Sequence, residues 1–384
     1  MENKIESVLF SAIRNLFSPI SLSMVSLSEE ELSALYALAK KHDMAHLVGA
    51  TLEKEGLLGE GALRAKFQKQ ALIAVLRQER FDYELSQIRS LLEEASIRFL
   101  PLKGSVIRPL YPEAWMRTSC DIDVLVDEEN LDAAVKLLCE KLGYEAEADR
   151  NYHDISLHAP SGVHLELHFS ILEHMESLDG ELSRVWEFSS PISEGSSEYR
   201  MTNEYLVFHT VAHMSYHFVH GGCGIRPFLD LFLMREKLPL DEAILLTHLR
   251  ACSLEQFYES AIALSEVWFS DRAPTDVTCA MQEFLLSGGV YGSEVNRISV
   301  AQGKKGSRGG YLLGRIFLPY EDLCLRYSVL KKKKWLFPIC QVRRWGRILF
   351  GGKAKRSMRE LRVSANISDE KRDRTGELLK KLGL

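Results

Sequence analysis

The stretch Asp121-Ile-Asp-Val-Leu-Val126 predicts a β-strand with two acidic side chains near its start. Side chains two residues apart point to the same face of a strand, so Asp121 and Asp123 share one face while Ile122 and Val124 share the other. Two carboxylates this close repel each other unless a cation lies between them. Hard oxygen ligands of this kind suit Mg²⁺, which proteins hold through one or two carboxylates plus substrate phosphates. The pattern therefore predicts a metal site, with a solvated edge strand as the alternative.

The residues before this strand suggest phosphate binding. Residues 97–102, Ile-Arg-Phe-Leu-Pro-Leu, predict a short strand that ends at Lys103-Gly104-Ser105. A Gly-Ser turn at that point offers backbone N–H groups and a hydroxyl to phosphate oxygens. Lys103 adds a point charge, and Arg117 adds a bidentate fork for the same triphosphate.

The residues after the strand supply a third carboxylate. A helix is predicted from about 130 to 142, closed by Gly143, and residues 155–158 and 163–168 predict a β-hairpin. Glu166 lies in the second strand of that hairpin. A carboxylate arriving from a neighbouring strand would complete a site for two ions, which stabilises both the attacking and the leaving oxygen of an in-line displacement at phosphorus.

In this order the sequence resembles the nucleotidyltransferase superfamily related to DNA polymerase β. More narrowly, it resembles a bacterial group of uncharacterised nucleotidyltransferases that is often found beside polysaccharide-synthesis genes. The matching segments are Leu102-Lys103-Gly104, Arg117, Asp121-Ile-Asp123-Val-Leu-Val126, Gly143-Tyr144 and Leu165-Glu166-Leu-His168. Two features depart from the superfamily pattern: the long spacer of residues 106–120, and Lys103 in a place where an apolar residue is usual.

The resemblance implies metal-dependent transfer of a nucleoside monophosphate from an NTP, with ATP expected, to an unknown acceptor. Mg²⁺ or Mn²⁺ would be the cofactor. By carry-over, Gly104 and Ser105 hold the triphosphate, Asp121 and Asp123 ligate both ions, and Glu166 ligates the ion beside the nucleophile. The alternative is a non-catalytic nucleotide-binding or regulatory module in a membrane-associated assembly. Transfer to an RNA end is less favoured, because the core of the chain is acidic.

The predicted fold class is α+β, a nucleotidyltransferase-fold mixed β-sheet core flanked by N- and C-terminal helical domains. We expect four parts, at 1–95 (helical), 96–190 (the core), 191–302 (helical) and 303–384 (basic). Ser28-Glu-Glu-Glu31 predicts a capping box at the start of a helix in the first part.

Histidines recur in the third part, where His209, His213 and His217 follow at i, i+4 and i+8. Two such imidazoles can share a metal, but i to i+8 spans about 12 Å, so three cannot. We therefore expect a helix face packed against the core, with one or two histidines near the substrate, rather than a transition-metal site. For Arg226 two hypotheses stay open, a phosphate contact and an ion pair with Asp230.

Charge is distributed unevenly along the 384 residues. The net charge is −5, but residues 303–384 contain 22 basic and 7 acidic side chains, which leaves the preceding residues at −20. Within the segment 331–359, cations alternate with Trp and Phe. That composition fits an anionic membrane surface, a nucleic-acid backbone, which is the less favoured partner, or a solvated face that complements the acidic body.

Seven widely spaced cysteines with no C-x-x-C pair argue against a disulfide framework and against a cysteine-type zinc site. No signal-peptide pattern and no apolar run of roughly 18 residues is present in the sequence. We therefore predict a cytoplasmic protein with no transmembrane segment, and peripheral association with a membrane is the open alternative.

Overall fold

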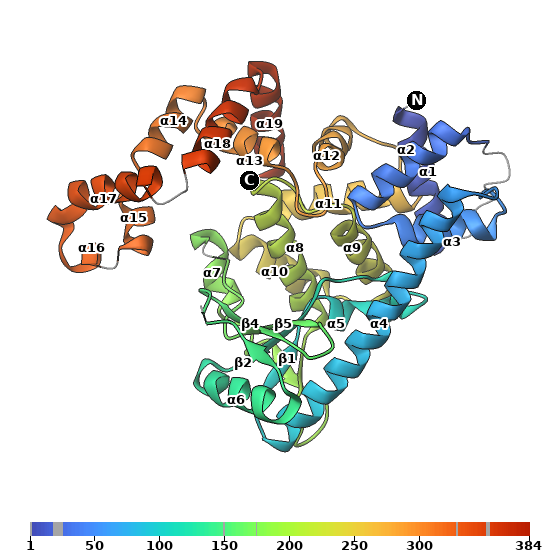
Figure 1. Ribbon diagram of the computed structural model, residues 1–384, viewed down its shortest axis with the longest axis horizontal. Coiled ribbons are helices and arrows are strands. Elements are labelled where there is room, and N and C mark those ends of the chain that lie inside the picture. The colour runs from blue at the N-terminus through green and yellow to red at the C-terminus, as the bar shows by residue number, and fades with distance from the viewer. Residues whose placement is uncertain (1, 18–25, 149, 174, 328, 351–353) are drawn as a thin grey trace. The chain divides into compact units, whose positions relative to one another are not determined.

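The computed structural model describes residues 2–17, 26–148, 150–173, 175–327, 329–350 and 354–384. The chain divides into two compact units, Met1–Tyr216 with Ile225–Thr278, and His217–Gly224 with Cys279–Leu384 (Figure 1). The four parts predicted from the sequence stay a prediction. Each unit is described by itself below.

A five-stranded mixed sheet forms the centre of the first unit. Its strand order is β1-β2-β5-β4-β3, with β2 parallel to β5 and the other neighbours antiparallel. The strands are β1 (Phe99–Pro101), β2 (Asp121–Val126), β3 (Glu145–Ala146), β4 (Asp154–His158) and β5 (His164–His168). This mixed sheet beside many helices confirms the predicted α+β class, and the strand expected at 121–126 has the predicted bounds.

One face of the sheet is apolar and packs against two helices, α4 (Ala62–Glu94) and α6 (Leu131–Leu142). Ile122, Val124 and Leu165 lie in this core because alternate side chains of β2 and β5 point to it. Gly143 ends α6 in a left-handed conformation, with φ of 70°, which glycine adopts without steric cost.

The opposite face of the sheet carries the polar side chains of β2 and β5. In Figure 1, α6 lies below the sheet and α8 (Asn203–Val219) lies above it. Three short elements connect β1 to β2, namely α5 (Gly104–Ile107), η1 (Arg108–Leu110) and η2 (Ala114–Met116), and η3 (Glu128–Asn130) follows β2.

The N-terminal helices are α1 (Glu2–Asn15), α2 (Glu29–Lys41) and α3 (Ala45–Lys54). The predicted capping box is confirmed at the start of α2, where the Ser28 hydroxyl accepts a hydrogen bond from the Glu31 N–H and the Glu31 carboxylate accepts one from the Ser28 N–H. Phe10 of α1 stacks on Trp268 of α11 (Glu255–Phe269) at 4.5 Å between ring centroids. Segments far apart in sequence are thereby joined in one core.

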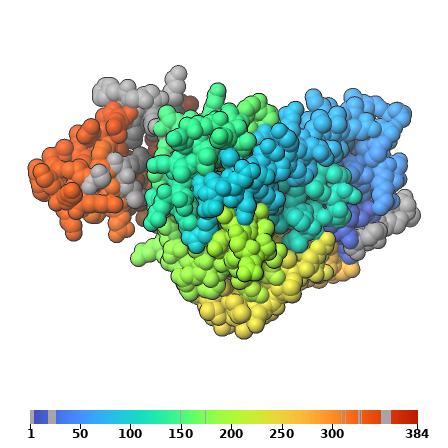
Figure 2. All heavy atoms as spheres, turned by 90° about the horizontal axis from the view of Figure 1, so that it is seen from below, coloured from blue at the N-terminus to red at the C-terminus, as the bar shows by residue number. Residues whose placement is uncertain are grey.

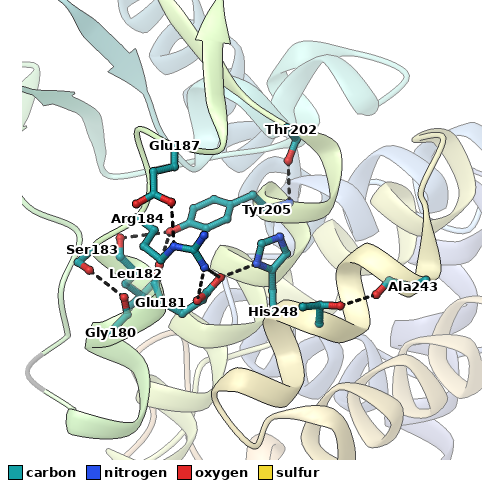
Figure 3. Close-up of polar contacts among 11 residues, drawn as sticks. Gly180, Glu181, Leu182, Ser183, Arg184, Glu187, Thr202, Tyr205, Ala243 and His248 are labelled. Atoms are coloured by element: carbon teal, nitrogen blue, oxygen red, sulfur yellow. Dashed lines mark hydrogen bonds and ion pairs between the residues drawn. The ribbon is translucent and has the colours of Figure 1, made fainter.

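The segment between β5 and α8 is fixed by buried polar contacts. It contains α7 (Glu176–Leu182) and the hairpin of β6 (Ser189–Pro191) and β7 (Tyr199–Met201). The Glu181 carboxylate lies 2.6 Å from Nδ1 of His248, on α10 (Glu242–Ala251), and the Tyr205 hydroxyl donates to the Glu181 carbonyl (Figure 3). These contacts tie α7 to α8 and α10.

The β6–β7 hairpin also contacts α4. Backbone N–H groups of Ser197 and Glu198 donate to the Glu93 carboxylate near the end of α4, and Arg89 pairs with Glu198 at 3.0 Å. Figure 2 shows this lime-coloured hairpin beside the cyan α4. Helix α9 (Arg226–Lys237) packs against α11 and completes this unit.

The second unit is helical in its described residues. Its helices are α12 (Asp276–Ser287), which begins in the first unit, α13 (Glu294–Lys304), α14 (Arg308–Ile316), α15 (Tyr320–Arg326), α16 (Val329–Lys332), η4 (Lys334–Leu336), α17 (Phe337–Phe350), α18 (Ala354–Asn366) and α19 (Asp369–Leu382). Helices α13 and α19 approach closely where Gly303 faces Gly376. A Cβ on Gly303 would lie only 3.2 Å from the Cα of Gly376. In the described parts of both units, no helix combines the length and the apolar character needed to cross a bilayer.

Candidate active site

The three carboxylates predicted from the sequence converge on the polar face of the sheet. The parallel pairing of β2 and β5 sets Asp121 opposite His164 and Asp123 opposite Glu166. One ligand atom from each of Asp121, His164 and Glu166 lies within 4.8 Å of the other two, and the same holds for Asp123, Glu166 and His168. The two histidines were not predicted as site residues. Their signal is the alternation of His164-Leu-Glu-Leu-His168, which puts both on the face of Glu166.

Asp123 lies deepest in this site and contacts an ammonium and an imidazole. Nζ of Lys103 lies 2.8 Å from Oδ1 of Asp123, and Nε2 of His168 lies 3.1 Å from the same oxygen. Only 4% of the Asp123 side chain is exposed. Lys103 reaches this position from a backbone with φ of 44°, a region that side-chain-bearing residues seldom adopt outside sites that constrain them.

The electrostatics separate the two aspartates. Burial, and then the negative charge of Asp123, raise the pKa of Asp121 to about 6. Burial alone would also raise the pKa of Asp123, but the Lys103 ammonium and the His168 imidazole hold it well below its usual range. The pKa of His168 is raised in spite of burial, because its ring bonds Asp123 and Glu166. The negative charge of Asp123 is therefore balanced by its neighbours, whereas the negative charge of Asp121 is less well balanced and would be stabilised by a bound cation.

The donors of the site fit a divalent cation of the hard or borderline class. Asp121 and Glu166 offer carboxylate oxygens, which suit Mg²⁺ and Mn²⁺, and His164 adds an imidazole nitrogen. The unfavourable proximity of the acidic groups supplies the electrostatic driving force for binding a cation here.

Comparison with known proteins gives one match that decides the family. Residues 28–270 match the model of an uncharacterised nucleotidyltransferase family. The chain belongs to the uncharacterised nucleotidyltransferase family. Membership supports a nucleotidyltransferase activity in general, and such enzymes use an NTP and in general a divalent metal. No curated protein and no solved structure matches this chain.

The turn expected to hold the triphosphate is Lys103-Gly104-Ser105. It lies at the start of α5, where the connection from β1 to β2 begins. A Cβ on Gly104 would lie 2.8 Å from Nη1 of Arg117 and 3.2 Å from Oγ of Ser119. A side chain here would therefore displace its neighbours. Ser105 is half-buried, and its N–H donates to the Leu102 carbonyl at 3.1 Å. The roles of Gly104 and Ser105 toward phosphate stay predictions.

Arg117 is buried beneath this turn in an ion pair. Its Nη2 lies 2.8 Å from Oδ2 of Asp230, its Nε lies 3.3 Å from Oδ1, and the Tyr111 hydroxyl donates to Oδ1 at 2.7 Å. Arg226 instead contacts Asp43 at 3.0 Å. The hypothesis of an Arg226–Asp230 pair is therefore wrong, because the Asp230 carboxylate accepts hydrogen bonds from Arg117 and Tyr111, which lie between β1 and β2. The predicted contact of Arg117 with the triphosphate stays a prediction.

The pKa values of the α8 histidines are affected by charged groups of the site on the sheet. Burial, followed by the charge of Lys103, lowers the pKa of His213 to about 3, and Nδ1 of His213 lies 2.7 Å from Glu173. Burial and then His213 lower the pKa of His209 to about 3. Among the described residues, the metal-capable clusters lie on β2 and β5 and include no histidine of α8. The role expected for these histidines, a packed face with one or two of them near the substrate, stays a prediction.

A cavity of about 430 Å³ opens beside the site, between α4 and the turn that precedes β5. Cys120 and Val163, which line it, precede Asp121 and His164 in the sequence, but the carboxylates themselves are not among its lining residues. Its other walls combine apolar with cationic side chains from α4: Ile73, Leu76, Arg77 and Arg80.

Proposed function

We propose that the protein is a metal-dependent nucleotidyltransferase that transfers a nucleoside monophosphate from an NTP, ATP in our proposal, to an acceptor. The observation that carries the proposal is the register of β2 and β5, which brings Asp121, Asp123 and Glu166 onto one buried face next to Lys103. Membership of the family supports the reaction class. The resemblance in sequence suggests an acceptor related to polysaccharide synthesis.

In the proposed reaction, a hydroxyl oxygen of the acceptor forms a bond to the α-phosphorus and releases its proton to water, and the bond from that phosphorus to the β-phosphate oxygen breaks. Pyrophosphate leaves with the electron pair of the broken bond. Asp121, Asp123 and Glu166 would hold Mg²⁺ or Mn²⁺, which supplies positive charge to the attacking and leaving oxygens. Lys103, Gly104, Ser105 and Arg117 would orient the triphosphate.

The chain's own residues contribute positioning and exclusion of water. The side chains of Asp123 and His168 are 4% and 5% exposed, so their contact is formed at low dielectric. The imidazole of His168 bonds both Asp123 and Glu166, and it thereby holds two of the three carboxylates in one orientation. Pre-organised charge of this kind lowers the cost of reorganisation during reaction.

The cavity beside α4 is the place we propose for the acceptor. Arg77 and Arg80 favour an anionic group, while Ile73 and Leu76 favour an adjoining apolar part. Its lining residues Cys120 and Val163 lie at the ends of β2 and β5 where these strands begin. We propose that an acceptor bound there extends around this edge of the sheet to the carboxylates.

We also propose peripheral binding to an anionic membrane through the segment 331–359, of which residues 351–353 lie outside the described part of the chain. Trp335 of η4 is 70% exposed, and Ile339 and Val342, three residues apart on α17, are 56% and 61% exposed. Lys331 to Lys334 precede them and are exposed. Exposed apolar side chains beside cations suit an interface with anionic lipid.

The membrane proposal is tested by sedimentation with vesicles of phosphatidylcholine, with and without phosphatidylglycerol. The full chain should sediment only with the anionic vesicles, and a triple variant, Trp335→Ser, Ile339→Ser and Val342→Ser, should remain in the supernatant. Ile244→Ser, at an exposed apolar position of α10, is the control. Equal sedimentation of the triple variant and the wild type would contradict the proposal, and retention on RNA alone would favour a nucleic-acid partner.

The reaction itself is tested by transfer of label from α-labelled ATP to fractions of a cell extract, together with release of pyrophosphate. The double variant Asp121→Asn with Asp123→Asn should lose both signals. Asp132→Asn, an exposed carboxylate on α6, should keep them. Equal turnover by wild type and double variant would refute the proposal. Binding of ATP by the wild type without pyrophosphate release would favour the alternative, a non-catalytic nucleotide-binding module.

A further inference from the structure

Two neighbouring aspartates of β2 differ in how their charge is balanced. Asp123 has two nitrogen groups on a single oxygen, the Lys103 ammonium at 2.8 Å and the His168 imidazole at 3.1 Å. In the described part of the chain, no lysine, arginine or histidine forms an ion pair with Asp121. Asp121 shares its surroundings with His164 and Glu166.

A divalent cation on the same oxygen of Asp123 would meet these two groups at contact distance. Two like charges about 4 Å apart repel by about 1 kcal/mol in water and several times more where the effective dielectric is lower, and the Asp123 side chain is 4% exposed. A second cation can therefore enter only if the Lys103 ammonium leaves. Glu166 has the His168 imidazole at 3.5 Å, and among the described residues the Lys103 ammonium forms its ion pair with Asp123 and not with Asp121 or Glu166.

The backbone holds Lys103 in its place. Its φ of 44° and ψ of −114° lie outside the regions that a lysine commonly adopts, and such a conformation persists only where surrounding contacts over-determine it. The contacts here are the ion pair with Asp123 and the Gly104 turn, which packs on Arg117 and Ser119. The ammonium is thus placed by its ion pair with Asp123, on a backbone that the turn constrains.

We infer that Lys103 takes the place of a second metal ion, so that the chain without nucleotide binds a single divalent cation, through Asp121, Glu166 and His164. Lys103 is then a positioning residue that supplies a fixed positive charge to Asp123. This inference rests on the proposed function, since it concerns the metal of that site. It replaces the two-ion arrangement expected from the sequence by one ion and one ammonium.

The test is the number of Mn²⁺ ions bound per chain without nucleotide, measured by isothermal titration calorimetry and by the loss of the free Mn²⁺ signal in electron paramagnetic resonance. The wild type should bind one ion. Lys103→Met, which keeps the length of the side chain and removes its charge, should bind two. Lys103→Arg should bind one, because the charge is restored. Lys136→Met, at an exposed position of α6, is the matched control and should behave as the wild type.

Several outcomes would overturn the inference. Binding of two ions, or of none, by the wild type would overturn it. Binding of only one ion by a folded Lys103→Met protein would also overturn it. Circular dichroism and the melting temperature establish whether that variant is folded. The outcomes also separate this inference from the proposed function. Label transfer by a wild type with two bound ions would remove the inference alone, whereas one bound ion without transfer would remove the proposed function alone.

Discussion

Loss of Asp230 should destabilise the first unit strongly, because the carboxylate neutralises a buried arginine. The side chains of Arg117 and Asp230 are 8% and 3% exposed and make two N–O contacts. Asp230→Asn keeps an oxygen that accepts from the Tyr111 hydroxyl, and it removes the charge and the oxygen that accepts from Nη2 of Arg117. Breaking one side of a buried pair costs about 3–5 kcal/mol, since the remaining charge is left without compensation.

The assay is urea unfolding followed by circular dichroism. With a slope of about 3 kcal/mol per molar urea, a loss of 3–5 kcal/mol lowers the midpoint by about 1 M or more. Glu255→Gln is the control, because its partner Arg250 is 63% exposed, and an exposed pair contributes at most about 1 kcal/mol.

A second variant separates uncompensated charge from other causes. Arg117→Met combined with Asp230→Asn removes both charges and leaves the acceptor for Tyr111. It should be more stable than Asp230→Asn alone, because no buried charge is left unpaired. A loss below about 1 kcal/mol in the single variant, or a double variant less stable than the single one, would refute the reasoning.

Three further results are expected. Gly104→Ala should cost about 1–3 kcal/mol of stability, because its Cβ would lie 2.8 Å from the Arg117 side chain; unchanged urea unfolding would argue against that contact. His209 has a pKa of about 3 in the folded chain, so between about pH 6.5 and that value only the unfolded chain takes up its proton. The free energy of unfolding should therefore fall by about 1.4 kcal/mol for each pH unit in this window. His209→Gln should flatten this slope, and an unaltered slope would show that His209 is not its source. Ser28→Ala should lower stability by about 0.5–2 kcal/mol through loss of the capping box, whereas Ser86→Ala, an exposed position within α4, should change it less; equal losses would contradict the capping role.

Local patterns in the sequence were sufficient for β1, β2, β4 and β5 and for the order of the site, but the short strands β3, β6 and β7 were not predicted. Alternation gave β2 its observed bounds at Asp121 and Val126, and Gly143 marked the end of α6. These features depend on neighbours within a few residues, and the physical rules for them act at that range. For the same reason Asp121, Asp123 and Glu166 could be assigned to one face before their strands were paired.

Partners distant in sequence could not be predicted in the same way. Asp230 pairs with Arg117, 113 residues away, and not with Arg226 on its own helix turn. The contact of Lys103 with Asp123 depends on a left-handed backbone conformation that no residue type in the turn signals. His168 became a site residue only once β2 and β5 were in register. Such contacts are decided by tertiary packing, which overrides local preference.

The parallel register of β2 and β5 also limits how this enzyme could change. Each strand presents reactive side chains on one face and core side chains on the other, so a shift of pairing by one residue would exchange the two sets. A mutation that moves one carboxylate by a single position along its strand would bury a charge. Under the proposal that the cavity holds the acceptor, a new substrate range would be reached through exposed side chains of α4 that line it, such as Ile73 and Leu76. For an engineer, the sheet is the part to keep, and these exposed side chains are the part to vary.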